Sequence, residues 1–154
     1  LLVDDGAAQR VLPAVATALK AQGVKLRGCP HARAVTDMEP ADEADWTTEY
    51  LASILSIKVV DGVDAAIEHI NSYGSGHTDG IITTSIGLAE KFVSGVDSAS
   101  VLVNASTRLS GGGDYGLGAV VGISTDKLHA RGPVGPEELT TYKWVAYGQG
   151  HLRS

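Results

Sequence analysis

The stretch that decides the fold is 54–103, ILSIKVVDGVDAAIEHINSYGSGHTDGIITTSIGLAEKFVSGVDSASVLV. It opens with a run at 54–60 that is rich in β-branched residues, and such a run predicts a strand. Apolar residues then recur at helical spacing until Gly74, at Val63, Ala66, Ile67 and Ile70. This change of period from strand to helix predicts a strand followed by a helix of about three turns.

The same order returns in the second half of the stretch. Residues 81–84 are expected to form a strand and 101–103 another. Between them, Ser85 is expected to cap a helix that buries three apolar side chains, those of Leu88, Phe92 and Val93. Strands that alternate with helices at this spacing indicate right-handed crossovers, and therefore an α/β fold with a mostly parallel sheet.

The pattern extends toward the N-terminus. Apolar residues 1–3 resemble the end of a strand, and 8–22 predicts a helix, in which Pro13 costs little only if it lies in the first turn. A short strand is expected at 24–26. Residues 28–48 are predicted to be irregular, and a connection of that length is often functional.

The last third of the chain differs in character. Residues 111–118 form a glycine-rich loop that contains the string Gly-x-Gly-x-x-Gly, but neither a strand before it nor a helix after it supports a dinucleotide fingerprint. A short helix is expected at 136–139, and 140–147 alternates like an exposed strand. Because that strand has no obvious partner in its own chain, we expect it to pair with a second subunit.

Composition narrows the classes of function. The chain has 154 residues, a net charge of −6 and no segment where Lys and Arg gather, which argues against a nucleic-acid partner. No apolar run approaches the roughly 20 residues that cross a bilayer, so no membrane association is expected. A single cysteine, Cys29, fits a reducing cytoplasm and is expected to be a loop residue without a catalytic role. The five histidines lack metal-ligand spacing, and His69 is expected to be solvated on a helix face.

Two polar segments follow strand candidates, 104–108 and 129–131. Ligands of α/β proteins bind beyond the ends of strands, and Arg108 and Arg131 could hold a carboxylate or a phosphate in bidentate fashion. The alternative is that each arginine caps a neighbouring element or forms a surface ion pair, and the residues alone leave both interpretations open.

Six segments together resemble the γ-glutamyl phosphate reductase family, which lies within the aldehyde dehydrogenase superfamily. The most specific of them is His-Ala-Arg-Gly-Pro, within 127–133. The six segments occur in family order, at 73–79, 104–108, 116–119, 123–125, 127–133 and 139–144. The resemblance implies an aldehyde dehydrogenase-like catalytic domain, a three-layer αβα arrangement with a mostly parallel sheet. It also implies that 1–109 is the remainder of this domain and that 110–154 holds a loop and a C-terminal oligomerisation strand.

The activity that this resemblance implies is the NADPH-dependent reduction of L-glutamyl 5-phosphate to L-glutamate 5-semialdehyde and phosphate, in proline biosynthesis. A cysteine thiolate is needed for it. In the family this cysteine precedes a Leu-Leu-Val segment, so the nucleophile is expected upstream of Leu1, and this chain alone is expected to be inactive. Homo-oligomerisation, a cytoplasmic location and coupling to glutamate 5-kinase are further implications.

The resemblance also assigns binding roles. Glu49 corresponds to the superfamily glutamate that holds the nicotinamide ribose of NADPH or NADP. Substrate binding is assigned to the two polar segments, at Asn104, Ser106, Thr107, Arg108, His129 and Arg131. No metal site is implied.

Three positions depart from the family pattern. Ile54 replaces an acid, Val120 replaces a glutamate and Pro136 replaces a leucine. With no nucleophile in the chain, these changes motivate a second hypothesis, a non-catalytic assembly or binding module that has kept the fold.

Overall fold

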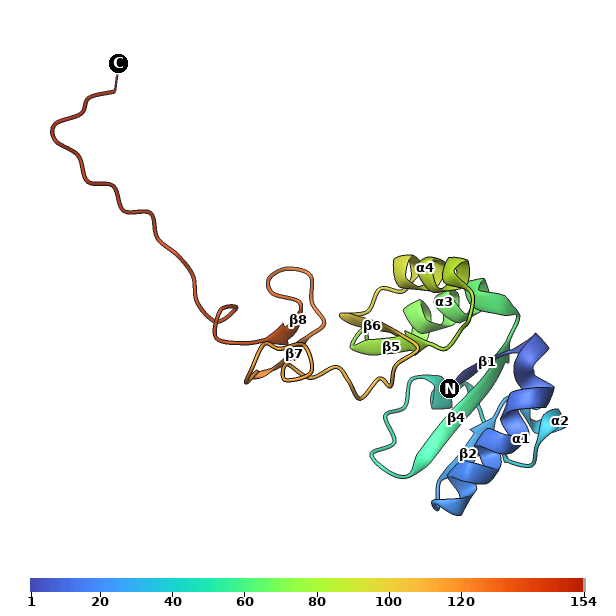
Figure 1. Cartoon of the computed structure of the whole chain (residues 1–154). Helices are drawn as coiled ribbons and strands as arrows, with labels where there is room; N and C mark the ends of the chain where they lie inside the picture. The colour runs from blue at the N-terminus through green and yellow to red at the C-terminus, as the bar shows by residue number, and fades with distance from the viewer. Residues whose placement is uncertain (154) are drawn as a thin grey trace.

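The computed structural model describes residues 1–153. Its N-terminal part is a four-stranded parallel sheet with strand order β1-β4-β2-β3. The strands are β1 (Leu2–Asp4), β2 (Lys25–Gly28), β3 (Glu39–Pro40) and β4 (Ile54–Val60). β4 lies between β1 and β2: its residues 54–57 pair with β2 and its residues 58–60 pair with β1. The expected strand at 54–60 is confirmed (Figure 1).

Helix α1 (Asp5–Ala21) covers one side of this sheet together with α2 (Pro30–Val35). Ala8, Leu12 and Ala16 recur every four residues and are all buried, in one core with Leu26 and Ile57. The helix continues through Pro13, which lies in its interior and not in the first turn. Pro13 has no N–H to donate to the carbonyl four residues earlier in the helix. Because Pro13 is exposed, water can hydrate that carbonyl.

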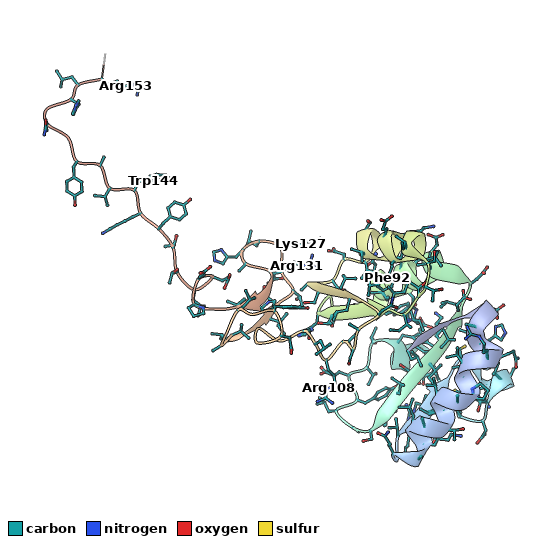
Figure 2. The ribbon with its side chains drawn as sticks, in the orientation of Figure 1. Phe92, Arg108, Lys127, Arg131, Trp144 and Arg153 are labelled. Atoms are coloured by element: carbon teal, nitrogen blue, oxygen red, sulfur yellow. The ribbon has the colours of Figure 1, made fainter. Side chains whose placement is uncertain are left out.

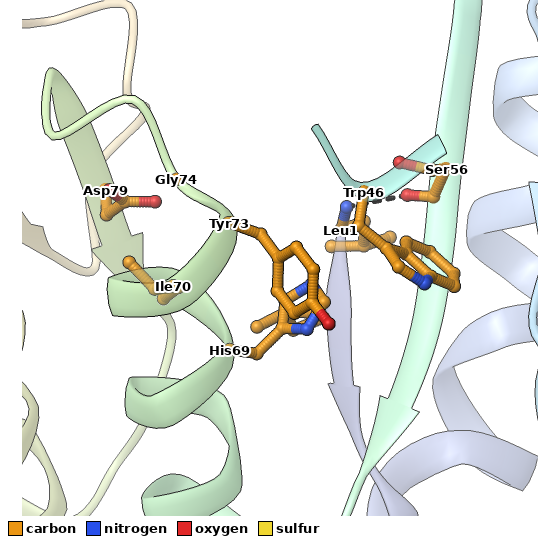
Figure 3. Close-up of a pocket in the computed structure, with 9 residues that line it drawn as sticks. Leu1, Trp46, Ser56, His69, Ile70, Tyr73, Gly74 and Asp79 are labelled. Carbon is orange, nitrogen blue, oxygen red and sulfur yellow. Dashed lines mark hydrogen bonds between the residues drawn. The ribbon is translucent and has the colours of Figure 1, made fainter. Parts of the chain in front are cut away.

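The other side of the sheet is occupied by α3 (Gly62–Tyr73), which packs against α4 (Ile86–Gly95). Figure 3 shows α3 and α1 on opposite sides of the β1–β4 pair. Gly95 allows α3 and α4 to approach closely, because a Cβ there would meet Ile67 at 2.9 Å. Beside these helices, β5 (Thr78–Ile81) and β6 (Ser100–Val103) form a second parallel pair. The α/β class with parallel strands is confirmed.

Two details of the second half differ from expectation. The strand expected at 81–84 ends at Ile81, because Thr83 exchanges backbone hydrogen bonds with the Asn104 side chain in place of a neighbouring strand. Ser85 caps α4 as expected, by accepting from Leu88 N. Of the three side chains expected to be buried by α4, only Phe92 is; Leu88 and Val93 remain 44% and 46% exposed.

Residues 28–48 are more regular than expected. They include the end of β2, α2, β3 and a short 3-10 helix, η1 (Glu43–Trp46). Cys29 caps α2: its buried Sγ accepts from Ala32 N and Val59 N, both at 3.4 Å. Cys29 thus lies in the connection between β2 and α2, outside helix and strand as expected, and has a structural role as the cap of α2. These elements are short and held by distant contacts, so no sequence period marks them.

The C-terminal part begins with an antiparallel hairpin of β7 (Gly122–Ser124) and β8 (Gly132–Val134), joined by loop 125–131. The helix expected at 136–139 is instead a turn, in which Glu138 Oε2 accepts from Gly135 N at 2.8 Å. The strand expected at 140–147 is not formed in this chain: from residue 140 the chain runs out from the body without a strand as far as residue 153 (Figure 1). Among the helices described, none has the length and apolar character needed to cross a membrane.

Candidate functional site

The loop after β6 begins with Asn104, one of the predicted substrate-binding residues. Its backbone is left-handed, with φ at 54°, and its N–H donates to Ile81 O at 2.8 Å. Its side chain accepts from Thr83 N and donates to Thr83 O, both at 2.9 Å. Asn104 therefore joins the ends of β5 and β6, with one hydrogen bond at each end of its side-chain amide.

Arg108 lies at the far end of the same loop. Ser106 Oγ accepts from Arg108 N at 3.3 Å, and the methyl group of Thr107 lies beside Gly80, where a Cβ would meet it at 3.4 Å. The Arg108 side chain is exposed and makes no hydrogen bond or ion pair within residues 1–153. The loop thus presents a free guanidinium to solvent.

Arg131 has a different environment, in the loop between β7 and β8. Its Nη1 donates to Asp97 Oδ1 at 2.8 Å and its Nη2 to Asp97 O at 3.0 Å. Lys127 Nζ donates to the other carboxylate oxygen at 2.6 Å. These two cations hold the pKa of Asp97 below its usual value, Lys127 most and Arg131 next.

A cavity of about 360 Å³ lies beside this ion cluster. Its polar lining combines Lys127 and Arg131 with hydroxyl groups from Ser75, Ser98 and Thr125. His129, which lies on the same loop, is exposed. Figure 2 shows Arg108 well apart from Lys127 and Arg131, so the structure of this chain does not bring the two predicted arginines together.

Glu49, the predicted ribose contact, lies in the connection between η1 and β4. It is exposed, and its carboxylate has no hydrogen bond or ion pair in the described part of the chain. A carboxylate in that state is free to accept hydrogen bonds from a bound molecule.

Asp45 is the buried carboxylate of this region, with 4% exposure. Its Oδ1 accepts from the Tyr50 hydroxyl at 2.5 Å and from Arg27 Nη1 at 2.7 Å, and its Oδ2 accepts from Asp42 N at 2.8 Å. These bonds, that of Tyr50 most, lower the pKa of Asp45 to about 2. Burial raises the pKa of Tyr50 in turn, with the Asp45 hydrogen bond as the next cause.

A second cavity, of about 160 Å³, lies between β1 and α3 and contains none of the predicted site residues (Figure 3). His69 on its wall packs against the rings of Trp46 and Tyr73. Lys58 Nζ lies 3.2 Å from His69 Nδ1 and faces both aromatic rings. Burial, and then Lys58, lower the pKa of His69. The expectation that His69 is solvated was wrong, because α3 turns this face toward η1.

Sequence reasoning missed four residues that organise these regions: Asp45, Tyr50, Asp97 and Lys127. Lys127 lies within one of the family-like segments, so a signal for it was present. Asp97 accepts a hydrogen bond from Arg131, which lies 34 residues later in the chain, and no local sequence pattern predicts such a contact. No group of three His, Cys, Asp or Glu side chains suited to a metal ion occurs within residues 1–153.

Comparison with known proteins identifies the family. The aldehyde dehydrogenase family profile matches residues 4–119. A curated γ-glutamyl phosphate reductase from Caulobacter sp. (strain K31) is 58% identical over 154 residues, which cover 99% of this chain and 37% of that protein. This chain therefore spans little more than a third of the length of that relative.

Solved structures agree with this result. The γ-glutamyl phosphate reductase of Thermotoga maritima superposes with a TM-score of 0.94 at 52% identity, over 100% of this chain and 37% of that one. The corresponding reductase of Saccharomyces cerevisiae gives a TM-score of 0.54 at 30% identity, over 70% of this chain and 29% of that one. The expected aldehyde dehydrogenase fold is confirmed.

Proposed function

Because this chain belongs to the aldehyde dehydrogenase family, we propose that it is the C-terminal part of a γ-glutamyl phosphate reductase. The observation that carries the proposal is the 58% identity to a curated reductase across the whole chain. The whole protein would reduce L-glutamyl 5-phosphate to L-glutamate 5-semialdehyde in proline biosynthesis, with NADPH as the reductant.

The reaction needs a cysteine thiolate, which we place upstream of Leu1. The thiolate attacks the acyl carbon and the bond from this carbon to the phosphate oxygen breaks. Inorganic phosphate departs, and the acyl group remains on the enzyme as a thioester of the cysteine. A bound NADPH, whose ribose Glu49 would hold, would supply the hydride for reduction of this thioester to the aldehyde, with release of the thiolate. The residues of the present chain have no part in bond breaking. Their proposed work is to bind the cofactor ribose and the anionic substrate.

Each binding role rests on a geometric feature. Glu49 is exposed and free to accept from ribose hydroxyls. Arg108 is exposed and has no internal acceptor in the described residues, so its guanidinium is available to the phosphate or the carboxylate of the substrate. Arg131 is held in a set position by its ion pair with Asp97, and both residues line the same cavity, where Arg131 is proposed to bind the substrate. Supporting contacts with the substrate are proposed for Asn104, Ser106, Thr107 and His129.

The proposed division of the chain follows the same assignment. Residues 1–109 would complete the catalytic domain, and 110–154 would carry the loop and oligomerisation segment of a homo-oligomer. A cytoplasmic location and coupling to glutamate 5-kinase, the enzyme class that makes acyl phosphates from glutamate, belong to this proposal as well.

The test uses the full-length protein from the same locus. Glutamate semialdehyde, inorganic phosphate and NADP should give phosphate-dependent formation of NADPH, and substitution of the upstream cysteine by serine should abolish it. A wild-type protein that folds but turns over neither NADP nor NADPH would favour the alternative, a non-catalytic assembly or binding module, to which the replacements at Ile54 and Val120 also point.

A further inference from the structure

We infer that Asp45 and Tyr50 form an anchor that holds Glu49 in position for the ribose of the nicotinamide nucleotide. Both are positioning residues, because neither is placed in contact with the cofactor. The inference rests on the proposed function for the role of Glu49, but the anchor is seen in the chain's own hydrogen bonds.

The first step is that Asp45 is a fixed point. It is buried in η1 and accepts three hydrogen bonds, from the Arg27 guanidinium on β2, the Tyr50 hydroxyl and Asp42 N. Arg27 stands in the middle of the sheet, where its strand β2 pairs with β4 and β3. A buried carboxylate with several hydrogen-bond partners, one of them on a strand of the sheet, is held more rigidly than a carboxylate in a surface ion pair.

The second step is that Tyr50 links Asp45 to the connection between η1 and β4 that carries Glu49. Within the described residues 1–153, the hydrogen bond from the Tyr50 hydroxyl to Asp45 joins residues 49–51 to the body of the domain. The Arg27 guanidinium also lies 5.7 Å from the centre of the Tyr50 ring. Tyr50 is therefore held at its hydroxyl and over its ring face, while Glu49 and Leu51 project outward.

The third step concerns the backbone of Leu51, the residue that follows Tyr50. Leu51 has a φ of 49° and is 90% exposed. A left-handed leucine is uncommon and persists only when its surroundings determine the conformation. With Leu51 exposed, its own side chain cannot supply that restraint, so it must come from the two neighbours. Tyr50 on one side is bonded to Asp45, and Ala52 O on the other accepts from Ile54 N of β4 at 2.8 Å. Strain of this kind at a connection suits a group that must be presented in one orientation.

The anchor thus explains how an exposed Glu49 could act without internal partners. A free carboxylate on a loose loop would lose conformational freedom each time it bound a ribose. A carboxylate whose adjacent residue is bonded to a buried ion pair has lost part of that freedom beforehand.

The experiment measures NADPH affinity of the full-length protein by fluorescence titration, alongside KM values in the NADP-linked assay. Tyr50→Phe removes only the hydroxyl and keeps the ring over Arg27. It should weaken NADPH binding and raise KM for NADP, each on the order of tenfold, the effect of one lost hydrogen bond to a charged group. KM for glutamate semialdehyde should stay unchanged. Asp45→Asn should act in the same direction.

The decisive comparison is a double-mutant cycle. Glu49→Gln should weaken NADPH binding by itself, and Tyr50→Phe added to Glu49→Gln should have little further effect, because Tyr50 acts through Glu49. Fully additive effects would overturn the inference, since they would mean that Tyr50 only supports the fold. So would an unchanged NADPH affinity in Tyr50→Phe.

Tyr73→Phe is the matched control. Tyr73 also donates its hydroxyl to a carboxylate of η1, that of Glu43, but it is not attached to residues 49–51. Its replacement should leave NADPH affinity unchanged, and equal weakening in both variants would overturn the anchor. If the wild-type protein binds NADPH but shows no turnover, the proposed function alone fails, and the binding cycle still decides the anchor. Wild-type protein that binds no nicotinamide nucleotide would overturn both.

Discussion

Asp97 and Arg131 are joined by two hydrogen bonds, at 2.8 Å to the carboxylate and at 3.0 Å to the main-chain oxygen. Asp97 N in turn donates to Asn71 Oδ1 of α3 at 2.9 Å. Since Lys127 uses the remaining carboxylate oxygen, one aspartate connects the α/β body to the loop that carries His129 and Arg131. The proposed substrate residues on this loop thus depend on Asp97 for their location.

We first predict that Asp97→Ala loosens this loop without unfolding the body. Amide hydrogens within 125–131 should exchange faster, and those of β4 should not, because the lost bonds fix only the loop. Hydrogen exchange with mass spectrometry on the full-length protein would measure this. Asp64→Ala is the control, since Asp64 also pairs with a lysine at 2.7 Å, but between α3 and α4. Similar exchange in both variants would contradict the assignment.

The two arginines should differ when each is replaced by alanine. Both changes are predicted to lower kcat/KM for the phosphorylated substrate by roughly ten- to a hundredfold, the effect of a lost charged hydrogen bond. Only Arg131→Ala should also lower the melting temperature, because Arg108 has no internal bond to lose in the described part of the chain. Steady-state kinetics and calorimetry measure the two effects. An unchanged kcat/KM in Arg131→Ala would refute its role with the substrate.

The sequence predicted the α/β body well where one element has a strong period. The strand at 54–60 is marked by its run of β-branched residues, and the helix that ends before Gly74 is marked by apolar residues at helical spacing. The helix cap at Ser85 was found for the same reason, since capping is local. The strand near 81 was misplaced because Asn104, 21 residues away, determines where the ladder ends.

The candidate site was predictable only as a set of segments. Resemblance located the loop after β6 and loop 125–131, but not the carboxylates behind them. Asp45 and Asp97 act through contacts to residues 18 and 34 positions away. A buried acid looks like any surface acid in a sequence, and only the fold reveals which cations surround it.

Asn104 permits a test of backbone and side-chain roles in one residue. Asn104→Gly keeps the left-handed φ accessible but removes both bonds to Thr83, whereas Asn104→Ala also adds strain. The glycine variant should lose about 1 kcal/mol of unfolding free energy, and the alanine variant about 1 kcal/mol more. Urea denaturation would measure both. An alanine variant as stable as the glycine variant would show that the conformation at 104 is not strained.

The stability of the protein should depend on Asp45 in acid. Its folded-state pKa is about 2, below the usual value near 4, so its contribution is complete above about pH 5 and is lost as pH falls toward 2. The stability difference between wild type and Asp45→Asn should therefore shrink over that window and stay constant above about pH 5. Tyr50→Phe removes the largest cause of the low pKa and should shift the loss to higher pH. Urea midpoints measured at several pH values would check this, and a difference independent of pH would contradict it.

The extended segment after residue 140 leads to the last prediction. Tyr142, Trp144 and Tyr147 are 80–96% exposed, and so much exposed aromatic area is expected to be covered by a second subunit. Light scattering of the full-length protein should give an oligomer. The double replacement Tyr142→Ser with Trp144→Ser should shift it toward the monomer, because aromatic side chains contribute most to such interfaces. Leu128→Ser is the control, since Leu128 is equally exposed but lies in the hairpin loop. A monomeric wild type, or an oligomer that survives the double replacement, would contradict pairing through 140–147.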